Sequence, residues 1–317
     1  MHLKLNFMSV NSQNNNKLIQ SAGNLKTGSS ETTRQLSNAL LCPPSSSWFA
    51  PWLAGVLDGD ANFDVRKISG KLKLKAIRIK LHVRDVKILN IIQNQLHFGR
   101  INHVRNKPYC IFIVSTIKDM STIVNLVNGS IRLKVDGFKK ACDSLNIAYC
   151  EANYKLQPMD PYFAGLIDTD GSIVFNYASN RIECNVELKN NEYSQKLNLD
   201  EVIPQVKPSI AYRNKSNQTS RKFKSISFKF QTVKGMIFVY EYFMKNRLYC
   251  DMKFYRISKI KPFLALRHYH NCPSTSLQWR LYRDFVLDFI QHRNAMWHRV
   301  PFVKKLLDKD IVHKRTH

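Results

Sequence analysis

The chain has 317 residues, which is long enough for two modest domains that each bury a core, and for a tail. Lysine and arginine number 49 against 23 aspartates and glutamates, so the formal net charge is +26. This excess favours a polyanionic partner, and nucleic acid is a better interpretation than a membrane because no apolar run approaches the roughly 20 residues of a bilayer span. A basic surface that is merely solvated is the alternative that charge alone leaves open.

Residues 1–46 are rich in Asn, Ser, Gln and Lys and show no sustained hydrophobic periodicity. Such a composition cannot bury enough apolar surface to offset the entropy of ordering, so a disordered leader is predicted. The absence of acidic residues before Glu31 suits an organelle transit peptide, whereas the absence of arginine before Arg34 fits an untargeted tail equally well.

The seven cysteines are scattered and form no C-x-x-C pair. This pattern predicts reduced, mostly buried thiols in an intracellular protein. The segment His268-Tyr269-His270-Asn271-Cys272 offers three zinc-ligand side chains. No second ligand pair occurs at finger-like spacing, so a zinc site there is the weaker interpretation.

Helix and strand patterns alternate through residues 48–147. In chain order the predicted elements are a helix over 48–60, strands over 63–68 and 72–83, a helix over 84–99, strands over 100–105 and 109–115, and helices over 118–127 and 134–147. The strand over 72–83 contains a phase slip near Ala76-Ile77, where the alternation of polar and apolar residues changes sides. The order is α-β-β-α-β-β-α-α.

The same order then repeats, which predicts an α+β protein built from two copies of one domain. The second series comprises a helix over 161–170, strands over 173–177 and 182–189, a helix over 192–206, strands over 209–213 and 222–232, and helices over 234–245 and 251–263. The predicted domains are the leader 1–46, a first repeat 48–150, a linker 151–159, a second repeat 160–273 and a C-terminal helical extension 274–317. In the extension, an aromatic amphipathic helix covers 277–294, and the basic end 301–317 is expected to fray.

Two related stretches begin the two series, residues 53–60 (LAGVLDGD) and 163–170 (FAGLIDTD). Their small residues recur at i, i+4 spacing and therefore share one helical face, which predicts two helices whose backbones approach closely. An ordinary core helix with one small face is the alternative for a single copy. The predicted domain-interface residues are Gly55, Gly59, Gly165 and Thr169.

Each stretch ends on an aspartate, Asp60 or Asp170, at the carboxyl end of its helix. The helix dipole disfavours a negative charge there, and two packed helices would bring the like charges together. A divalent cation would relieve both effects, and oxygen-only ligands favour Mg²⁺ over zinc. The preceding pair, Asp58 and Asp168, is predicted to be structural, buried at the helix contact with hydrogen bonds to backbone groups.

The paired stretches and the repeated element order resemble the LAGLIDADG homing endonuclease family, in its single-chain two-repeat form, over roughly residues 48–265. The resemblance implies two pseudo-symmetric αββαββα repeats whose curved antiparallel sheets form a DNA-binding saddle. It also implies that the motif helices form the central interface, and that Asp60 and Asp170 hold the catalytic metal at the scissile phosphates. Ala61 stands where the family usually has Gly, and Phe163 where it usually has Leu.

The resemblance further implies one catalytic lysine per repeat, at the start of a late helix. By position these are Lys134 and Lys253. Such a lysine would organise water and stabilise developing negative charge at the phosphate. A solvated lysine at a helix start is the alternative for each.

Rows of polar side chains on the strands are predicted to face duplex DNA, because Arg and Lys can recognise guanine edges, Gln adenine, and Glu the cytosine amine. Acidic residues on such a face would be base readers or partners of lysine. The predicted DNA-contacting residues are Lys73, Lys75, Arg78, Lys80 and His82 in the first repeat, and Glu183, Asn185, Glu187, Ser225, Ser227, Lys229 and Gln231 in the second.

These features predict a site-specific endonuclease, a monomer that hydrolyses both strands of a long asymmetric double-stranded DNA target with Mg²⁺. The resemblance implies intron homing as its role. One alternative is a maturase that binds its own group I intron RNA and assists splicing, with or without nuclease activity. Another is a DNA-binding protein without chemistry. No membrane association is expected, and the Asn- and Lys-rich composition suits the mitochondrion, with the chloroplast as alternative.

Overall fold

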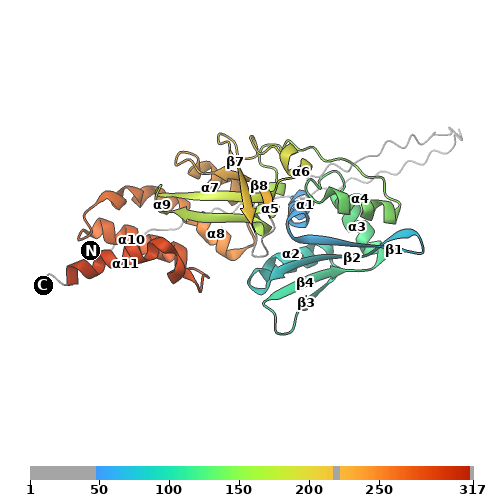
Figure 1. Cartoon of the computed structure of the whole chain (residues 1–317), viewed down its shortest axis with the longest axis horizontal. Helices are drawn as coiled ribbons and strands as arrows, with labels where there is room; N and C mark the ends of the chain where they lie inside the picture. Colours follow the sequence, from blue (N-terminus) through green and yellow to red (C-terminus); the bar gives the residue numbers. More distant parts are fainter. Residues whose placement is uncertain (1–47, 217–221, 315–317) are drawn as a thin grey trace, which may run out of the picture. The chain divides into compact units, whose positions relative to one another are not determined.

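The computed structural model describes residues 48–216 and 222–314, so the predicted leader 1–46 lies outside the described residues. Within them, two series of elements follow one another in the same order (Figure 1). The α+β fold class with two repeats is confirmed.

The first repeat is organised around one antiparallel sheet of four strands, in the order β1-β2-β4-β3. Its elements are α1 (Phe49–Asp60), β1 (Ala61–Ile68), β2 (Lys71–His82), the 3-10 helix η1 (Val83–Asp85), α2 (Val86–Leu96), β3 (Arg100–His103), β4 (Tyr109–Val114), α3 (Ile117–Val127) and α4 (Val135–Leu145).

The second repeat has the equivalent sheet, in the order β5-β6-β8-β7. Its elements are α5 (Tyr162–Thr169), β5 (Gly171–Asn176), β6 (Arg181–Lys189), α6 (Glu192–Lys196), β7 (Ser209–Ser216), β8 (Lys222–Phe230), α7 (Met236–Lys245), α8 (Asp251–Ser258) and α9 (Ile260–Leu266). The extension adds the 3-10 helix η2 (Arg267–Asn271), α10 (Leu277–Gln291), η3 (Trp297–Arg299) and α11 (Pro301–Lys314). None of the helices in the described part of the chain is long and apolar enough to cross a bilayer.

Each sheet turns one apolar face toward helices, because side chains alternate between the two faces of a strand. The buried residues of that face are Cys110, Phe112 and Val114 on β4, and Ile226, Phe228 and Phe230 on β8. Helix α4 packs on β1 and β2 in the first repeat, and α8 packs on β5 in the second. The opposite face of each sheet carries the polar rows described below.

The predicted phase slip in the second strand is present in β2. Ala76 and Ile77 are consecutive and both buried, which a regular alternation would not allow. The pairing of β1 with β2 shifts register between Asp64 and Val65, on the facing strand. This irregularity keeps the lysines before it and the basic residues after it on the exposed side.

The helix predicted over 192–206 is wrong in its length, since α6 ends at Lys196. The main chain after α6 forms hydrogen bonds with the linker instead. Leu156 N–H donates to Asn198 O at 3.1 Å, and Asn198 N–H donates to Tyr154 O at 2.9 Å. These long-range hydrogen bonds replace the local bonds that would have continued the helix.

The C-terminal end is also corrected, because residues 301–314 form the helix α11 where fraying was expected. Val303 and Leu306 are buried at i, i+3 spacing, and Phe302 stacks on Tyr177 of the second repeat. The apolar stripe anchors the helix in spite of its basic composition. Residues 315–317 lie outside the described part of the chain.

Candidate active site and nucleic-acid interface

Helices α1 and α5 pack directly against each other (Figure 1). Their small residues form the contact. A Cβ on Gly55 would overlap the carbonyl oxygen of Tyr162, and one on Gly165 would overlap that of Trp52. A Cβ on Gly59 would collide with the side chain of Thr169. The structure therefore brings all the predicted interface residues together, and two of the glycines meet backbone that has no room to move.

Asp58 connects the two repeats from inside this contact. Its carboxylate accepts hydrogen bonds from Arg132 N–H at 2.7 Å and Lys134 N–H at 2.9 Å, both within its own repeat. It also accepts one from the Tyr162 hydroxyl of α5, at 2.7 Å. Burial raises the pKa of Asp58, although these donors oppose the rise.

Asp168 has the equivalent position in the second repeat. It accepts hydrogen bonds from the backbone N–H groups of Tyr249 and Cys250, at 2.9 and 2.8 Å, and from the Trp52 indole N–H of α1, at 3.1 Å. Burial raises the pKa of Asp168 to about 6. Each inner aspartate is thus held by two backbone donors of its own repeat and one side-chain donor of the other.

Removing one such donor should weaken the fold measurably. We expect Tyr162→Phe to lower the free energy of unfolding by about 2 kcal/mol, because it leaves a buried carboxylate short of one hydrogen bond. The matched control is Tyr242→Phe, since the buried Tyr242 hydroxyl donates to the neutral carbonyl of Asp160 at 2.6 Å and should cost only about 1 kcal/mol. Equal losses in urea unfolding would contradict a special role for Asp58.

The outer aspartates occupy the carboxyl ends of the packed helices. Asp60 is the last residue of α1, and Asp170 is the C-cap of α5. Loss of hydration raises the pKa of Asp60, and the charge of Asp170 raises it further. Loss of hydration also raises the pKa of Asp170. The two carboxylates are therefore within electrostatic reach of each other, in surroundings that disfavour their negative charge.

The lysines predicted from position lie beside these carboxylates. Lys134 Nζ donates to the carbonyl oxygens of Gly59 and Ala61, each at 2.6 Å. Lys253 Nζ donates to the carbonyls of residues 167, 168 and 169, at 2.7, 2.8 and 3.0 Å. Each ammonium group thus caps the carboxyl end of the motif helix in its own repeat, where the dipole is negative.

The alternative of a solvated helix-start lysine is wrong for both positions. Lys253 is only 9 % exposed, and Lys134 is partly buried. Burial lowers the pKa of Lys134, while the charges of Asp170 and Asp60 oppose the change. Both lysines in turn oppose the raised pKa of each outer aspartate. The centre therefore contains two acids and two ammonium groups that interact as one electrostatic unit.

A third acid, Asp85 at the end of η1, was missed by sequence reasoning. Its charge also raises the pKa of Asp60, which brings it within electrostatic reach of the centre. It accepts a hydrogen bond from the Cys250 thiol across the two repeats, at 3.1 Å. The available signal was an acid just after the strand β2, whose last residues return to the end of the motif, since Ile79 pairs with Ala61.

The donor set at the centre suits a hard divalent cation, because carboxylate oxygens are its preferred protein ligands. Within residues 48–216 and 222–314, no group of three or more His, Cys, Asp or Glu side chains is placed to hold a metal. Asp60 and Asp170 would therefore need further oxygen ligands from backbone, water or substrate. The segment 268–272, which offers three zinc-ligand side chains, has a different contact in the structure, because His270 packs its ring on Tyr177 and Tyr282.

Ala61, placed where the family usually has Gly, fits its position without strain. Its backbone is extended, with φ −84° and ψ 156°, so no left-handed conformation is needed after Asp60. The departure at Phe163 is also accommodated, because that side chain is fully buried against Phe230 and Tyr242.

The predicted polar row of the first repeat lies on one face of its sheet. Lys73, Lys75, Lys80 and His82 are exposed on β2. Arg78 is partly buried and donates to Asp64 at 2.6 Å, and the hydrogen bonds from Arg66 and Arg78 lower the pKa of Asp64 to about 2. The face is therefore strongly cationic, with one paired acid.

The predicted row of the second repeat also shares one face. Register places Asn185 of β6 beside Lys229 of β8, and Glu187 beside Ser227. Gln231 accepts a hydrogen bond from Arg181 at 3.0 Å. Asn185 Oδ1 is buried and lacks a hydrogen-bond partner among the described residues, which leaves an acceptor for a ligand.

Three predicted contacts of the second repeat need correction. Glu183, Ser225 and Ser227 are only 5, 2 and 2 % exposed. Burial opposes ionisation of Glu183, but its hydrogen bonds, first among them that from Arg181, outweigh burial and lower its pKa. These three side chains expose too little surface in this structure to form the outer row of the face.

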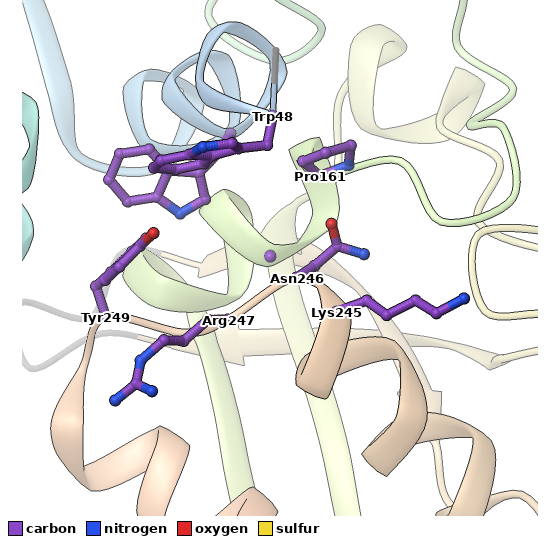
Figure 2. A pocket seen from close by; sticks show the side chains of 8 residues that line it. Trp48, Pro161, Lys245, Asn246, Arg247 and Tyr249 are labelled. Carbon is purple, nitrogen blue, oxygen red and sulfur yellow. The ribbon is translucent and has the colours of Figure 1, made fainter. Parts of the chain in front are cut away.

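The other end of the motif helices contains a small cavity of about 140 Å³ (Figure 2). Trp48, Trp52 and Tyr249 line it together with Pro161 and Asn246. Trp48 is the N-cap of α1, whereas Asp60 is the last of its 12 residues. A helix of that length spans roughly 18 Å, so the cavity is remote from the outer aspartates.

Comparison with known proteins relates the chain to one family. Residues 53–136 match the family model described as "LAGLIDADG endonuclease". The chain is 29% identical over 189 residues to the "Intron-encoded RNA maturase bI4" of Saccharomyces cerevisiae, covering 52% of this chain and 28% of the relative. It is 25% identical over 148 residues to the "Intron-encoded DNA endonuclease aI3" of the same yeast, covering 40% and 36%. The chain thus spans about a third of the length of these relatives.

A solved structure shares the fold. It is the "I-LtrWI LAGLIDADG homing endonuclease bound to target DNA", with a TM-score of 0.51 at 11% identity, covering 76% of this chain and 97% of that one. The family-model match, the intron-encoded relatives and the common fold agree with the paired motifs. The chain is therefore similar to the LAGLIDADG endonuclease family over residues 53–136, and its two-repeat fold is that of the solved structure.

Proposed function

We propose that this protein is a site-specific endonuclease that hydrolyses both strands of a long asymmetric DNA target, with Mg²⁺ as cofactor, in intron homing. The observation that carries the proposal is the pairing of Asp60 and Asp170 at the ends of two packed helices. One relative is named as an intron-encoded DNA endonuclease, and the structure with the same fold is described as bound to target DNA.

The two halves of the centre would serve one DNA strand each. Asp60 and Lys134 come from the first repeat, and Asp170 and Lys253 from the second. The acids would hold the cation and orient the attacking water, while the ammonium groups lower the cost of negative charge at the phosphate. When bound, Mg²⁺ would polarise a phosphoryl oxygen and lower the pKa of its water.

The polar sheet faces would bind the duplex. Lys73, Lys75, Lys80 and Lys229 would supply charge for the phosphate backbone. The buried residues Glu183, Ser225 and Ser227 would position their neighbours instead of contacting bases. Because the two faces differ in sequence, the target would be asymmetric, and because one chain supplies both, the protein would act as a monomer.

The second candidate function is that of a maturase. It is favoured by the name of one relative, an intron-encoded RNA maturase. The partner would then be group I intron RNA, bound with or without retained DNA cleavage. The presence of both outer aspartates favours the nuclease, because RNA binding by itself does not require two acids with raised pKa at the centre.

The proposal is tested with a duplex that carries the exon junction without the intron. In Mg²⁺ we expect double-strand cleavage at one site, and EDTA should abolish it while leaving binding of the duplex in a gel-shift assay. The intron-containing duplex is the control and should not be cut. Splicing rescue without any cleavage of the junction would favour the maturase instead.

We infer mitochondrial localisation, with the chloroplast as alternative. The support is the Asn- and Lys-rich composition together with relatives that are encoded within introns. Fractionation of cells that express the protein from its native locus is the direct measurement.

A further inference from the structure

A groove runs along the outer edge of the second sheet, between β5 and the start of α11. It encloses about 470 Å³ and is called the edge groove below. Its residues come from the sheet on one side and from the extension on the other. They are Val174, Phe175, Asn176, Tyr177, Ala178, Glu183, Val300, Pro301, Phe302 and Lys305.

The wall of the groove formed by α11 is firmly attached to the sheet. Phe302 stacks on Tyr177 with ring centroids 4.9 Å apart and planes 6° from parallel, and it contacts Phe175 at 5.8 Å. Val303 and Leu306 are buried behind it. The start of α11 therefore keeps a defined position beside β5.

The hairpin turn at the end of the groove is anchored as well. Asn180 donates to the carbonyl oxygen of Arg267 at 2.9 Å and accepts from the Tyr282 hydroxyl at 2.8 Å. These contacts come from η2 and α10, so the extension supports the whole outer end of β5 and β6. In the first repeat, the equivalent turn at Gly70 has open space around it.

The lining of the groove contains one cation, Lys305, and one acid, Glu183, and the segment around the start of α11 is basic. Residues 289–307 include no Asp or Glu. The exposed basic side chains there include Arg299, Lys304 and Lys305. Glu183, the acid that lines the groove, is paired with Arg181 at 2.8 Å. Asn176 donates to Glu183 at 2.9 Å from the polar side of β5, so the polar face extends into the groove without a break.

We propose that the edge groove and the basic start of α11 bind the phosphate backbone of duplex DNA that flanks the half-site of the second repeat. The inference rests on the proposed function and extends it, because it makes the footprint longer on one side. Lys305 lines the same groove as Asn176 of the polar face, and the exposed Arg299 and Lys304 are close to it in sequence, so a duplex that continues past β5 would come near these cations. Each phosphate contact adds salt-dependent affinity without base specificity.

The test compares two targets, a long duplex and one truncated on the side of the second repeat. The variant is Arg299→Gln with Lys304→Gln and Lys305→Gln. All three side chains are exposed, so their replacement should leave the fold intact. On the long target we expect about tenfold or weaker binding at 0.1 M salt, and a salt slope shallower by about 1 for each lost phosphate contact. On the truncated target the variant should bind like the wild type.

The matched control replaces three exposed lysines on the helical side of the first repeat, Lys118→Gln with Lys139→Gln and Lys140→Gln. It should lose little affinity on either target. The inference is overturned if the α11 variant equals the wild type on the long target, or loses affinity equally on both targets. It is also overturned if the variant loses affinity for intron RNA but keeps its affinity for both DNA targets.

The proposed function fails separately, and the inference with it, if the wild type binds neither target. Specific cleavage by a wild type whose binding is insensitive to the flank would refute the inference and leave the proposed function standing.

Discussion

Asp60→Asn and Asp170→Asn are each expected to reduce double-strand cleavage by at least about 1000-fold, which corresponds to about 4 kcal/mol of transition-state stabilisation. The amide keeps the shape of the side chain but removes the charge that holds a divalent cation. Because double-strand cleavage needs both halves of the centre, either substitution should suffice. Binding of the target should remain within about threefold, since neither acid contributes charge attraction to DNA.

The free energy of unfolding of these variants distinguishes a specific loss of cleavage from misfolding. The raised pKa values of Asp60 and Asp170 show that the fold disfavours both charges, so neutralising one should leave the free energy of unfolding equal or slightly higher. Asp143→Asn, at an exposed position on α4, is the control and should cleave normally. Full cleavage by either variant would refute the assignment of the metal ligands. Single-turnover cleavage and gel-shift titration measure the two quantities.

Gly165→Ala should lower the free energy of unfolding by about 3 kcal/mol or more. The added methyl would overlap the backbone carbonyl of Trp52, and only separation of α1 from α5 could relieve the collision. Separation would also stretch the hydrogen bond from the Trp52 indole to Asp168. The loss therefore combines overpacking with a weakened buried carboxylate.

Gly137→Ala is the matched control for this substitution. Gly137 lies within α4, and a methyl there would meet the Phe63 ring at an ordinary 3.6 Å. Alanine in a helix interior should stabilise by about 0.5–1 kcal/mol relative to glycine. Urea unfolding of both variants measures the two effects. If Gly165→Ala lowers the free energy of unfolding by less than about 1 kcal/mol, the two helices can separate slightly without a large loss of stability, which would contradict the tight contact.

Local patterns were sufficient to predict the elements that depend on neighbours in sequence. Alternation along β2, including the slip at Ala76-Ile77, could be predicted because the side-chain period of a strand is a local property. The spacing of small residues in the motifs likewise predicted which faces meet, since a helix with one small face packs through it. The family resemblance pointed to Lys134 and Lys253, and in the structure Lys134 is the N-cap of α4 and Lys253 lies in the first turn of α8.

Other features depend on residues far apart in the chain and could not be predicted. Helix α6 is short because the linker takes the hydrogen bonds of Asn198. Helix α11 is ordered because the Phe302 ring stacks on the ring of Tyr177. In each case a distant partner outweighed a local preference.

Periodicity and the size of side chains were enough to predict the two repeats, the close helix contact and the positions of the outer aspartates. The hydrogen bonds that join the repeats became visible only in the folded chain. Tyr162 of one repeat reaches Asp58 of the other, and Trp52 reaches Asp168 in return. Such an exchange depends on where two backbones lie relative to each other, which no local pattern encodes.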